Sequence, residues 1–197
     1  MQLFDTKGRG IDRVTENAVV FEDNHYEVDC LIFATGFEVG TGYTRRAGYD
    51  VVGRDGIRLS DKWANGLSTF HGFQSRGFPN CFHMGLTQST LTVNFTHLLD
   101  EQSIHIGYIV GQVTAAEAQT VETSEEAESA WVETIRTLAR QDDKFRAECT
   151  PGYYNTEGKS SAATDFTGGQ YGPGPIEFFK LLSEWRSEGK LSGLEIS

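Results

Sequence analysis

A nearly continuous apolar run occupies Asp29-Cys30-Leu31-Ile32-Phe33-Ala34-Thr35-Gly36-Phe37. Apolar residues that do not alternate with polar ones are typical of a strand buried on both faces, in a sheet covered by other layers. The run ends at a glycine turn, as strands do at the carboxyl edge of an open α/β sheet, where ligands of such folds bind. The small residues Ala34 and Gly36 would let a cofactor approach the backbone. A core strand that ends in an ordinary glycine turn explains the same residues.

The segments on either side of this run also have strand character. Ala18–Phe21 and residues 26–34 are separated by polar turn residues, which predicts a hairpin. Short strands are expected at 49–52 and 57–59 around a Gly-Arg-Asp-Gly turn, and at 81–84 before Gly85. The fold class predicted from these patterns is α/β.

Three helices are expected after residue 95, because the apolar period there changes from two to 3.6. The first spans about 96–116. The second begins at Thr123 with a capping box to Glu126, and the third begins near Pro175 and ends at Gly189. The apolar face of the first helix is Leu98, Leu99, Gln102, Ile106, Ile109, Val110 and Val113. That of the second is Ala127, Trp131, Ile135 and Leu138. That of the third is Phe178, Leu181, Leu182 and Trp185.

The order of these elements leaves the predicted sheet incomplete. A strand buried on both faces needs helices on both sides of its sheet, yet the first 95 residues show no helical pattern. We therefore expect part of the domain to be missing from this chain.

Composition limits the function classes. The chain has 197 residues, 17 Lys+Arg against 28 Asp+Glu, and a formal net charge of −11 at pH 7. An acidic surface repels phosphate groups, so neither nucleic acid nor an anionic membrane is expected as a partner. No apolar run approaches the length of a membrane span, no signal peptide is visible, and three separated cysteines suit a reducing compartment. The predicted location is the cytoplasm.

Common catalytic signatures are absent from the sequence. Neither G-x-x-x-x-G-K-[ST] nor G-x-S-x-G occurs, and Gly8-Arg9-Gly10 lacks the third glycine of a dinucleotide fingerprint. Cys81 is expected to be a buried, inert core residue, so no dyad with His83 is expected. His97, Glu101 and His105 have metal-like spacing, but they fall opposite the apolar stripe and lack further ligands, so a solvated polar face explains them.

Two loops are further candidates for a binding site. The polar residues Thr87-Gln88-Ser89-Thr90 follow Gly85 and lead through Asn94 into the first long helix, whose positive end could hold a carbonyl or an anionic ring edge. Ordinary helix capping by Asn94 explains the same residues. Tyr153-Tyr154-Asn155 begins an aromatic loop that could cover a pocket or simply pack against its neighbours.

Together these segments resemble the C-terminal portion of a flavin-containing monooxygenase of the Baeyer–Villiger type. The resemblance covers about residues 4–193. It is carried by 29–39, by Trp63, Thr69 and Gly72, by Gly77-Phe78-Pro79-Asn80-Cys81-Phe82, by Gly85 and Asn94, and by 151–158. The Ala-Thr-Gly turn is widespread in two-dinucleotide flavoproteins, whereas Phe37 together with the Phe-Pro-Asn strand is more specific.

The resemblance implies a two-dinucleotide-binding-domain flavoprotein, with an incomplete FAD-domain sheet and C-terminal helices. Residues 1–28 would end the NADP-binding domain, and 29–197 would form the C-terminal part of the FAD-binding domain with a mobile loop. FAD and NADP are the implied cofactors, and O2 and a ketone or heteroatom compound are the implied substrates. The implied cofactor contacts are Ala34, Thr35, Gly36, Phe37, Gly85, Gln88, Asn94 and Phe95, and the implied lid contains Tyr153, Tyr154 and Asn155.

This sequence also departs from the family pattern. Both glycine-rich fingerprints, the signature stretch between them and the family's catalytic arginine belong to a missing N-terminal portion, and the mobile loop lacks its usual tryptophan. We therefore expect an FAD- and NADPH-dependent monooxygenase whose C-terminal fragment is inactive alone. The alternative is a non-catalytic module that complements a partner flavoprotein. A remnant of a pyridine-nucleotide disulfide oxidoreductase shares the Ala-Thr-Gly turn, but it would need a cysteine pair that the sequence lacks.

Overall fold

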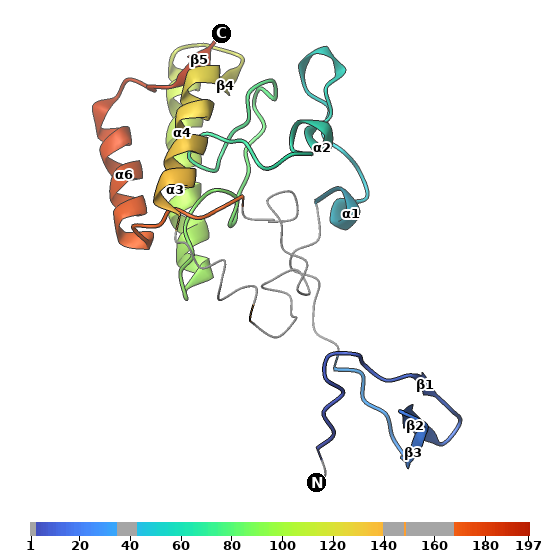
Figure 1. Ribbon diagram of the computed structural model, residues 1–197. Helices are drawn as coiled ribbons and strands as arrows, with labels where there is room; N and C mark the ends of the chain where they lie inside the picture. The colour runs from blue at the N-terminus through green and yellow to red at the C-terminus, as the bar shows by residue number, and fades with distance from the viewer. Residues whose placement is uncertain (1–2, 35–42, 140–147, 149–167) are drawn as a thin grey trace.

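Three short strands near the N-terminus precede a mainly helical part in the computed structural model, which describes residues 3–34, 43–139, 148 and 168–197 (Figure 1). The described elements are β1 (Arg13–Val14), β2 (Ala18–Phe21), β3 (Asn24–Glu27), α1 (Tyr43–Ala47), the 3-10 turn η1 (Arg54–Gly56), α2 (Leu59–Lys62), α3 (Phe95–Ala115), β4 (Val121–Thr123), α4 (Glu125–Leu138), α6 (Pro175–Glu188) and β5 (Leu194–Ile196). Within the described residues, β1–β3 form one antiparallel sheet and β4–β5 a second.

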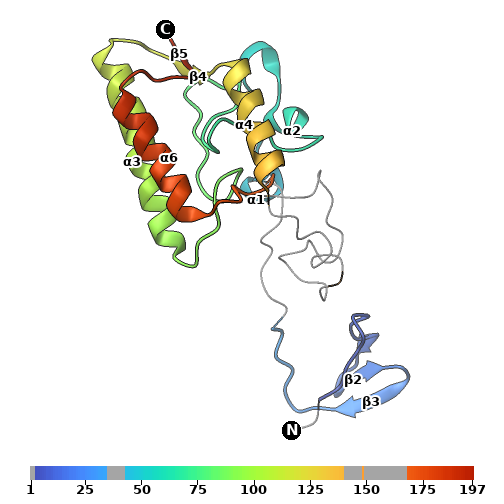
Figure 2. The same ribbon diagram turned by 60° about the vertical axis from the view of Figure 1, so that its left-hand side comes forward.

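The predicted N-terminal hairpin forms, but Asn24 and His25, which were expected in the turn, belong to β3, and the strand predicted at 26–34 ends at Glu27. β2 pairs with β3 from Ala18↔Glu27 to Phe21↔Asn24. The two-residue turn uses Glu22 and Asp23 with φ of 50° and 62°, as the twist of a tight hairpin requires. This sheet lies apart from the helices in both views (Figures 1 and 2). A domain boundary at residue 28 stays a prediction.

The predicted buried strand at 29–34 is wrong for this chain. These residues form no strand, and the side chains of Ile32 and Phe33 are 81% and 74% exposed. A doubly buried strand needs paired neighbours and a covering layer, and the described part of the chain supplies neither beside this run. The exposed apolar side chains are consistent with an FAD-domain sheet that is incomplete here.

The short strands predicted further along are reduced to isolated contacts. Val52 and Arg58 form a single bridge around η1, at the expected turn, and Leu59 already begins α2. Residues 81–84 are not a strand. The His83 N–H donates a hydrogen bond to the Phe73 carbonyl, which lies in a loop, at 2.7 Å. The segment therefore bonds to a loop and not to a neighbouring strand.

Helix α3 agrees with its prediction to within one residue. Asn94 caps it, with its side-chain oxygen accepting the His97 N–H at 3.1 Å. Its buried residues are Leu98, Gln102, His105, Ile109 and Val113. The prediction placed His105 on a polar face with His97 and Glu101, and this is wrong, because the imidazole of His105 packs among aromatic rings in the core.

The other two long helices also form where the pattern predicts. The cap of α4 is Ser124 rather than Thr123, since the Ser124 hydroxyl accepts the Ala127 N–H at 3.1 Å. Pro175 opens α6, and Gly189 at φ 67° closes it in the left-handed conformation. α3 and α6 lie side by side (Figures 1 and 2).

The helices bury two apolar clusters. One joins Phe73 to Trp131 and Ile135 of α4 and to Phe178 and Leu182 of α6. The other joins Ile109 and Val113 of α3 to Val121 of β4. These clusters hold the loop of residues 67–90 against α3, α4 and α6.

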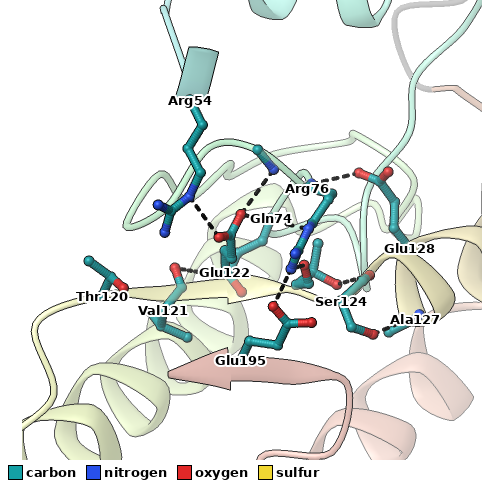
Figure 3. Close-up of polar contacts among 12 residues, drawn as sticks. Arg54, Gln74, Arg76, Thr120, Val121, Glu122, Ser124, Ala127, Glu128 and Glu195 are labelled. Atoms are coloured by element: carbon teal, nitrogen blue, oxygen red, sulfur yellow. Dashed lines mark hydrogen bonds and ion pairs between the residues drawn. The ribbon is translucent and has the colours of Figure 1, made fainter. Parts of the chain in front are cut away.

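A cluster of charged residues connects the 54–77 segment to β4, α4 and β5 through hydrogen bonds and ion pairs (Figure 3). The buried carboxylate of Glu122 accepts hydrogen bonds from Arg54 Nε at 2.9 Å and from the Gly77 N–H at 3.0 Å. Arg76 bonds Glu195 of β5 through its guanidinium, and its backbone N–H bonds Glu128 of α4 at 2.8 Å. Each acidic side chain thus joins segments far apart in the sequence.

Candidate functional site

Residues 85–90 form a turn between the extended 81–84 segment and α3, and we call it the 85–90 turn. Gly85 is half-buried with φ of 116°, a backbone conformation that L side chains rarely adopt. Gln88, Ser89 and Thr90 are buried. The turn therefore follows one defined path through the interior, which the glycine at its start makes possible.

The side chain of Gln88 is fully engaged within the protein. Its Oε1 accepts the Thr69 N–H at 2.8 Å and the Thr69 hydroxyl at 2.7 Å. Its Nε2 donates to the carbonyls of Leu67 and Gly168, at 3.0 and 3.4 Å. A contact from Gln88 to a cofactor stays a prediction, and its side-chain amide already makes four hydrogen bonds within the protein.

Gln102 is a residue that the sequence reasoning counted only among the apolar positions of α3. Its side chain is fully buried, and its amide bonds both backbone groups of Gly85: Oε1 accepts the N–H at 2.9 Å and Nε2 donates to the carbonyl at 2.8 Å. The sequence does contain a signal for this role, because Gln102 lies on a predicted helix face formed otherwise by Leu, Ile and Val. A buried side-chain amide requires hydrogen-bond partners, so a glutamine at such a position indicates a specific polar contact.

Two further elements hold the far end of the turn. Trp131 of α4 donates its indole N–H to the Gln88 carbonyl at 3.1 Å. The Tyr171 N–H donates to the Ser89 carbonyl at 2.8 Å. The 85–90 turn is thus bound by α3, by α4 and by the segment that leads into α6.

The residues between the turn and α3 expose apolar side chains beside the positive end of a long helix. Leu91, Val93 and Phe95 are all exposed large hydrophobic residues, and Asn94 is exposed at the cap position. The first N–H groups of a helix lack partners within the helix and favour negative charge. This surface combines an apolar patch with a polar helix end, which suits a planar ring system with one polar edge.

The other predicted site residues fall mostly outside the described part of the chain. Ala34 is described and exposed. Thr35, Gly36 and Phe37, and the loop residues Tyr153, Tyr154 and Asn155, lie outside the described residues. The structure therefore describes the candidate site at 85–95 and leaves the other two predicted segments as predictions.

A buried histidine pair lies beside the turn and was not singled out from the sequence. The rings of His71 and His105 have centroids 6.1 Å apart, and His71 meets the Trp131 ring edge-on at 4.8 Å. Burial, with the neighbouring His105, lowers the pKa of His71 to about 3. Burial, with the nearby Arg186 guanidinium, lowers the pKa of His105 to about 3. Both rings are neutral core groups at neutral pH.

The Cys81–His83 pair shows no activated thiol. Burial raises the pKa of the Cys81 thiol, which disfavours the thiolate, and burial lowers the pKa of His83 to about 4. Among the described residues, no group of three or more His, Cys, Asp or Glu could hold a metal ion. No described helix has the length and apolar character of a membrane span.

The comparisons with known proteins place this architecture among flavin-dependent oxygenases. The chain is 48% identical over 196 residues to pentalenolactone D synthase of Streptomyces exfoliatus, a match that covers 98% of this chain and 33% of the relative. It is 44% identical over 188 residues to a Baeyer–Villiger monooxygenase of Streptomyces coelicolor, with 94% and 30% covered. The chain is homologous to Baeyer–Villiger monooxygenases. It spans about a third of the length of these relatives, which is consistent with a C-terminal portion. No protein-family model matches the chain.

Solved structures give the same result for the fold. A polycyclic ketone monooxygenase from Thermothelomyces thermophila has a TM-score of 0.84 and 35% identity, covering 98% of this chain and 32% of that one. A cyclohexanone monooxygenase from Rhodococcus sp. Phi1 bound to NADP+ has a TM-score of 0.78 and 26% identity, with 98% and 35% covered. The α/β arrangement is therefore that of part of a flavin monooxygenase, as the resemblance implied.

Proposed function

We propose that this chain is the C-terminal part of an FAD- and NADPH-dependent monooxygenase that inserts one oxygen atom of O2 into a ketone or adds it to a heteroatom. The observation that carries this proposal is the match to a Baeyer–Villiger monooxygenase over 94% of the chain. Other relatives are named FAD-binding monooxygenases, and one similar structure contains NADP+. FAD and NADP are therefore the cofactors that we propose.

The described residues fit a flavin ring at 85–95. The ring needs an apolar surface for its benzenoid part and hydrogen-bond donors for its polar edge. Leu91, Val93 and Phe95 would supply the apolar surface, and the cap residue Asn94 and the first turn of α3 would supply donors. The backbone at Ala34 and Gly85 would complete the contacts, together with Thr35, Gly36 and Phe37, which lie outside the described part of the chain.

In this role the chain supplies shape rather than reacting groups. FAD, when bound, supplies the electron transfer and the activation of O2. The 85–90 turn would fix the position of one side of the cofactor, because three separate elements hold it. Leu91, Val93 and Phe95 would exclude water beside it. Tyr153, Tyr154 and Asn155 would close the substrate side.

The isolated chain is proposed to be inactive. Its sequence contains no Gly-x-Gly-x-x-Gly unit to hold the phosphates of either dinucleotide. The exposed Ile32 and Phe33 would be covered by the N-terminal portion of the same enzyme, the proposed partner of this chain.

A chimera tests the proposal. The C-terminal third of pentalenolactone D synthase is replaced by this chain, and the purified chimera is assayed for bound FAD, NADPH consumption and product with that enzyme's own substrate. The N-terminal two thirds alone is the control. Restored FAD binding and oxygenation support the proposal. A folded chimera that holds FAD but forms no product contradicts it and favours a non-catalytic complementing module.

A further inference from the structure

We propose that Gln102 is a positioning residue for the flavin site. By holding both backbone groups of Gly85 it would set the path of the 85–90 turn along the cofactor. This inference rests on the proposed function and adds a role for a residue that reaches neither cofactor nor substrate.

The geometry is a two-point contact between one side chain and one residue's backbone. Gln102 Oε1 lies 2.9 Å from the Gly85 nitrogen, and Nε2 lies 2.8 Å from the Gly85 oxygen. Because a planar amide makes both bonds, it fixes the position and the direction of Gly85 together. The Ser89 hydroxyl donates a second hydrogen bond to the Gly85 oxygen, at 2.8 Å, which links the two ends of the turn.

The contact lies in the buried part of the molecule. Gln102 lies in the second turn of α3, with its side chain fully buried between Leu98 and His105 on the inner face. The far end of the turn is held by Trp131 and by the Tyr171 N–H. Without Gln102, Gly85 would keep, of these bonds, only the one from the Ser89 hydroxyl. Sites held by a rigid supporting shell keep their geometry within a fraction of an ångström, and sites without one drift.

The alternative is that Gln102 is an ordinary buried amide that stabilises the fold and nothing more. The two roles predict different effects when the side chain is lost. A structural residue changes the melting temperature and leaves turnover per folded molecule unchanged. A positioning residue changes the yield of product per NADPH consumed, because NADPH would then reduce O2 to hydrogen peroxide without oxygenating the substrate.

The test compares three variants in the active chimera. Gln102→Met removes both hydrogen bonds at nearly constant volume. Gln112→Met is the matched control, since Gln112 is exposed on the same helix. Gln102→Glu retains both bonds only while its carboxyl is protonated, because a carboxylate cannot donate to the Gly85 carbonyl.

We expect Gln102→Met to lower product per NADPH by roughly tenfold, with KM for NADPH nearly unchanged. Gln112→Met should match the parent. Gln102→Glu should recover coupling at low pH and lose it as pH rises through the pKa of the new carboxyl. Equal coupling in Gln102→Met and the parent, per bound flavin, overturns the inference.

A second measurement keeps the inference separate from the proposed function. Hydrogen exchange of amides 85–89 is measured in the 197-residue chain without cofactors. Gln102→Met should accelerate this exchange about tenfold, while Gln112→Met leaves it unchanged. Exchange at the parent rate in Gln102→Met overturns the positioning role even if the chimera is active. An inactive parent chimera with accelerated exchange in Gln102→Met would instead refute the proposed function and, with it, the role toward a flavin.

Discussion

The imidazole rings of His71 and His105 meet edge-on inside the helical core, with centroids 6.1 Å apart. Around them lie Phe70 and Phe73, the indoles of Trp131 and Trp185, and the Arg186 guanidinium, whose Nη1 is 3.4 Å from His105 Nδ1. No described carboxylate pairs with either ring. A protonated histidine would therefore add a positive charge beside the Arg186 guanidinium with no described carboxylate to neutralise it.

We expect the chain to lose stability in mild acid. Burial lowers the pKa of both histidines to about 3 in the folded protein, while in the unfolded chain they titrate near their usual value of about 6.5. Below pH 6.5 the unfolded state therefore binds more protons than the folded state. The free energy of unfolding falls by up to about 1.4 kcal/mol per pH unit for each histidine as pH drops from about 6.5 to about 3.

Thermal melts between pH 7.5 and 4.5 test this expectation. The double variant His71→Phe/His105→Phe should show a flatter dependence of melting temperature on pH than the parent. His25→Gln, at an exposed position of β3, is the control and should follow the parent curve. An equally steep curve for the double variant would mean that other groups cause the acid sensitivity.

Gly85 should tolerate no side chain, although space is available for one. A Cβ built on Gly85 meets nothing within 4 Å, so the obstacle is the φ of 116° alone. Gly85→Ala should lower the free energy of unfolding by about 1–3 kcal/mol. Gly107, inside α3 and equally open, is the matched control, and Gly107→Ala should raise stability by about 0.4–1 kcal/mol. Urea titration of both variants measures this difference. Equal changes in the free energy of unfolding would contradict the requirement for glycine at position 85.

Glu122 should contribute more to stability than its exposed charge partner suggests. Arg54 is 52% exposed, so that ion pair alone is worth little. The hydrogen bond from the Gly77 N–H to the buried carboxylate should make the larger contribution to stability. Glu122→Leu should therefore lower the free energy of unfolding by about 1–3 kcal/mol, because it leaves that donor unpaired. Glu126→Leu, at an exposed position of α4, should change stability by less than about 0.5 kcal/mol. Similar losses in both variants, measured by urea titration, would argue against the buried bond.

Thr90 offers a stabilising substitution. Its Oγ1 is buried and has no hydrogen-bond partner among the described residues. Thr90→Val keeps the shape and removes an unsatisfied polar atom, so we expect stability to rise by about 1 kcal/mol. Differential scanning calorimetry measures the change. A loss of comparable size would show that the hydroxyl is bonded in solution.

Local signals explain what the sequence could predict. α3, α4 and α6 were found because a 3.6-residue apolar period and terminal caps are properties of the helix itself. The error of one residue at α4 arose because Thr123 and Ser124 are both good caps, and only the structure shows which hydroxyl accepts the Ala127 N–H.

Long-range partners explain the failures. Residues 29–34 have the composition of a buried strand, but burial depends on neighbouring strands that the described chain does not place beside them. His105 was assigned by helical position to a polar face, although it lies three residues after Gln102 and four before Ile109, at the spacing of the buried face. The 85–90 turn could be identified as a candidate, whereas its attachment to Gln102, 17 residues away, required coordinates.

The central claim is that this chain supplies one wall of a flavin site and is inactive without the rest of the enzyme. The most direct test measures substrate-dependent NADPH consumption with added FAD for three samples: this chain alone, the N-terminal two thirds of pentalenolactone D synthase alone, and the two joined. We predict that only the joined protein consumes NADPH and forms product. Consumption by the isolated chain, or none by a folded, FAD-containing joined protein, would contradict the claim.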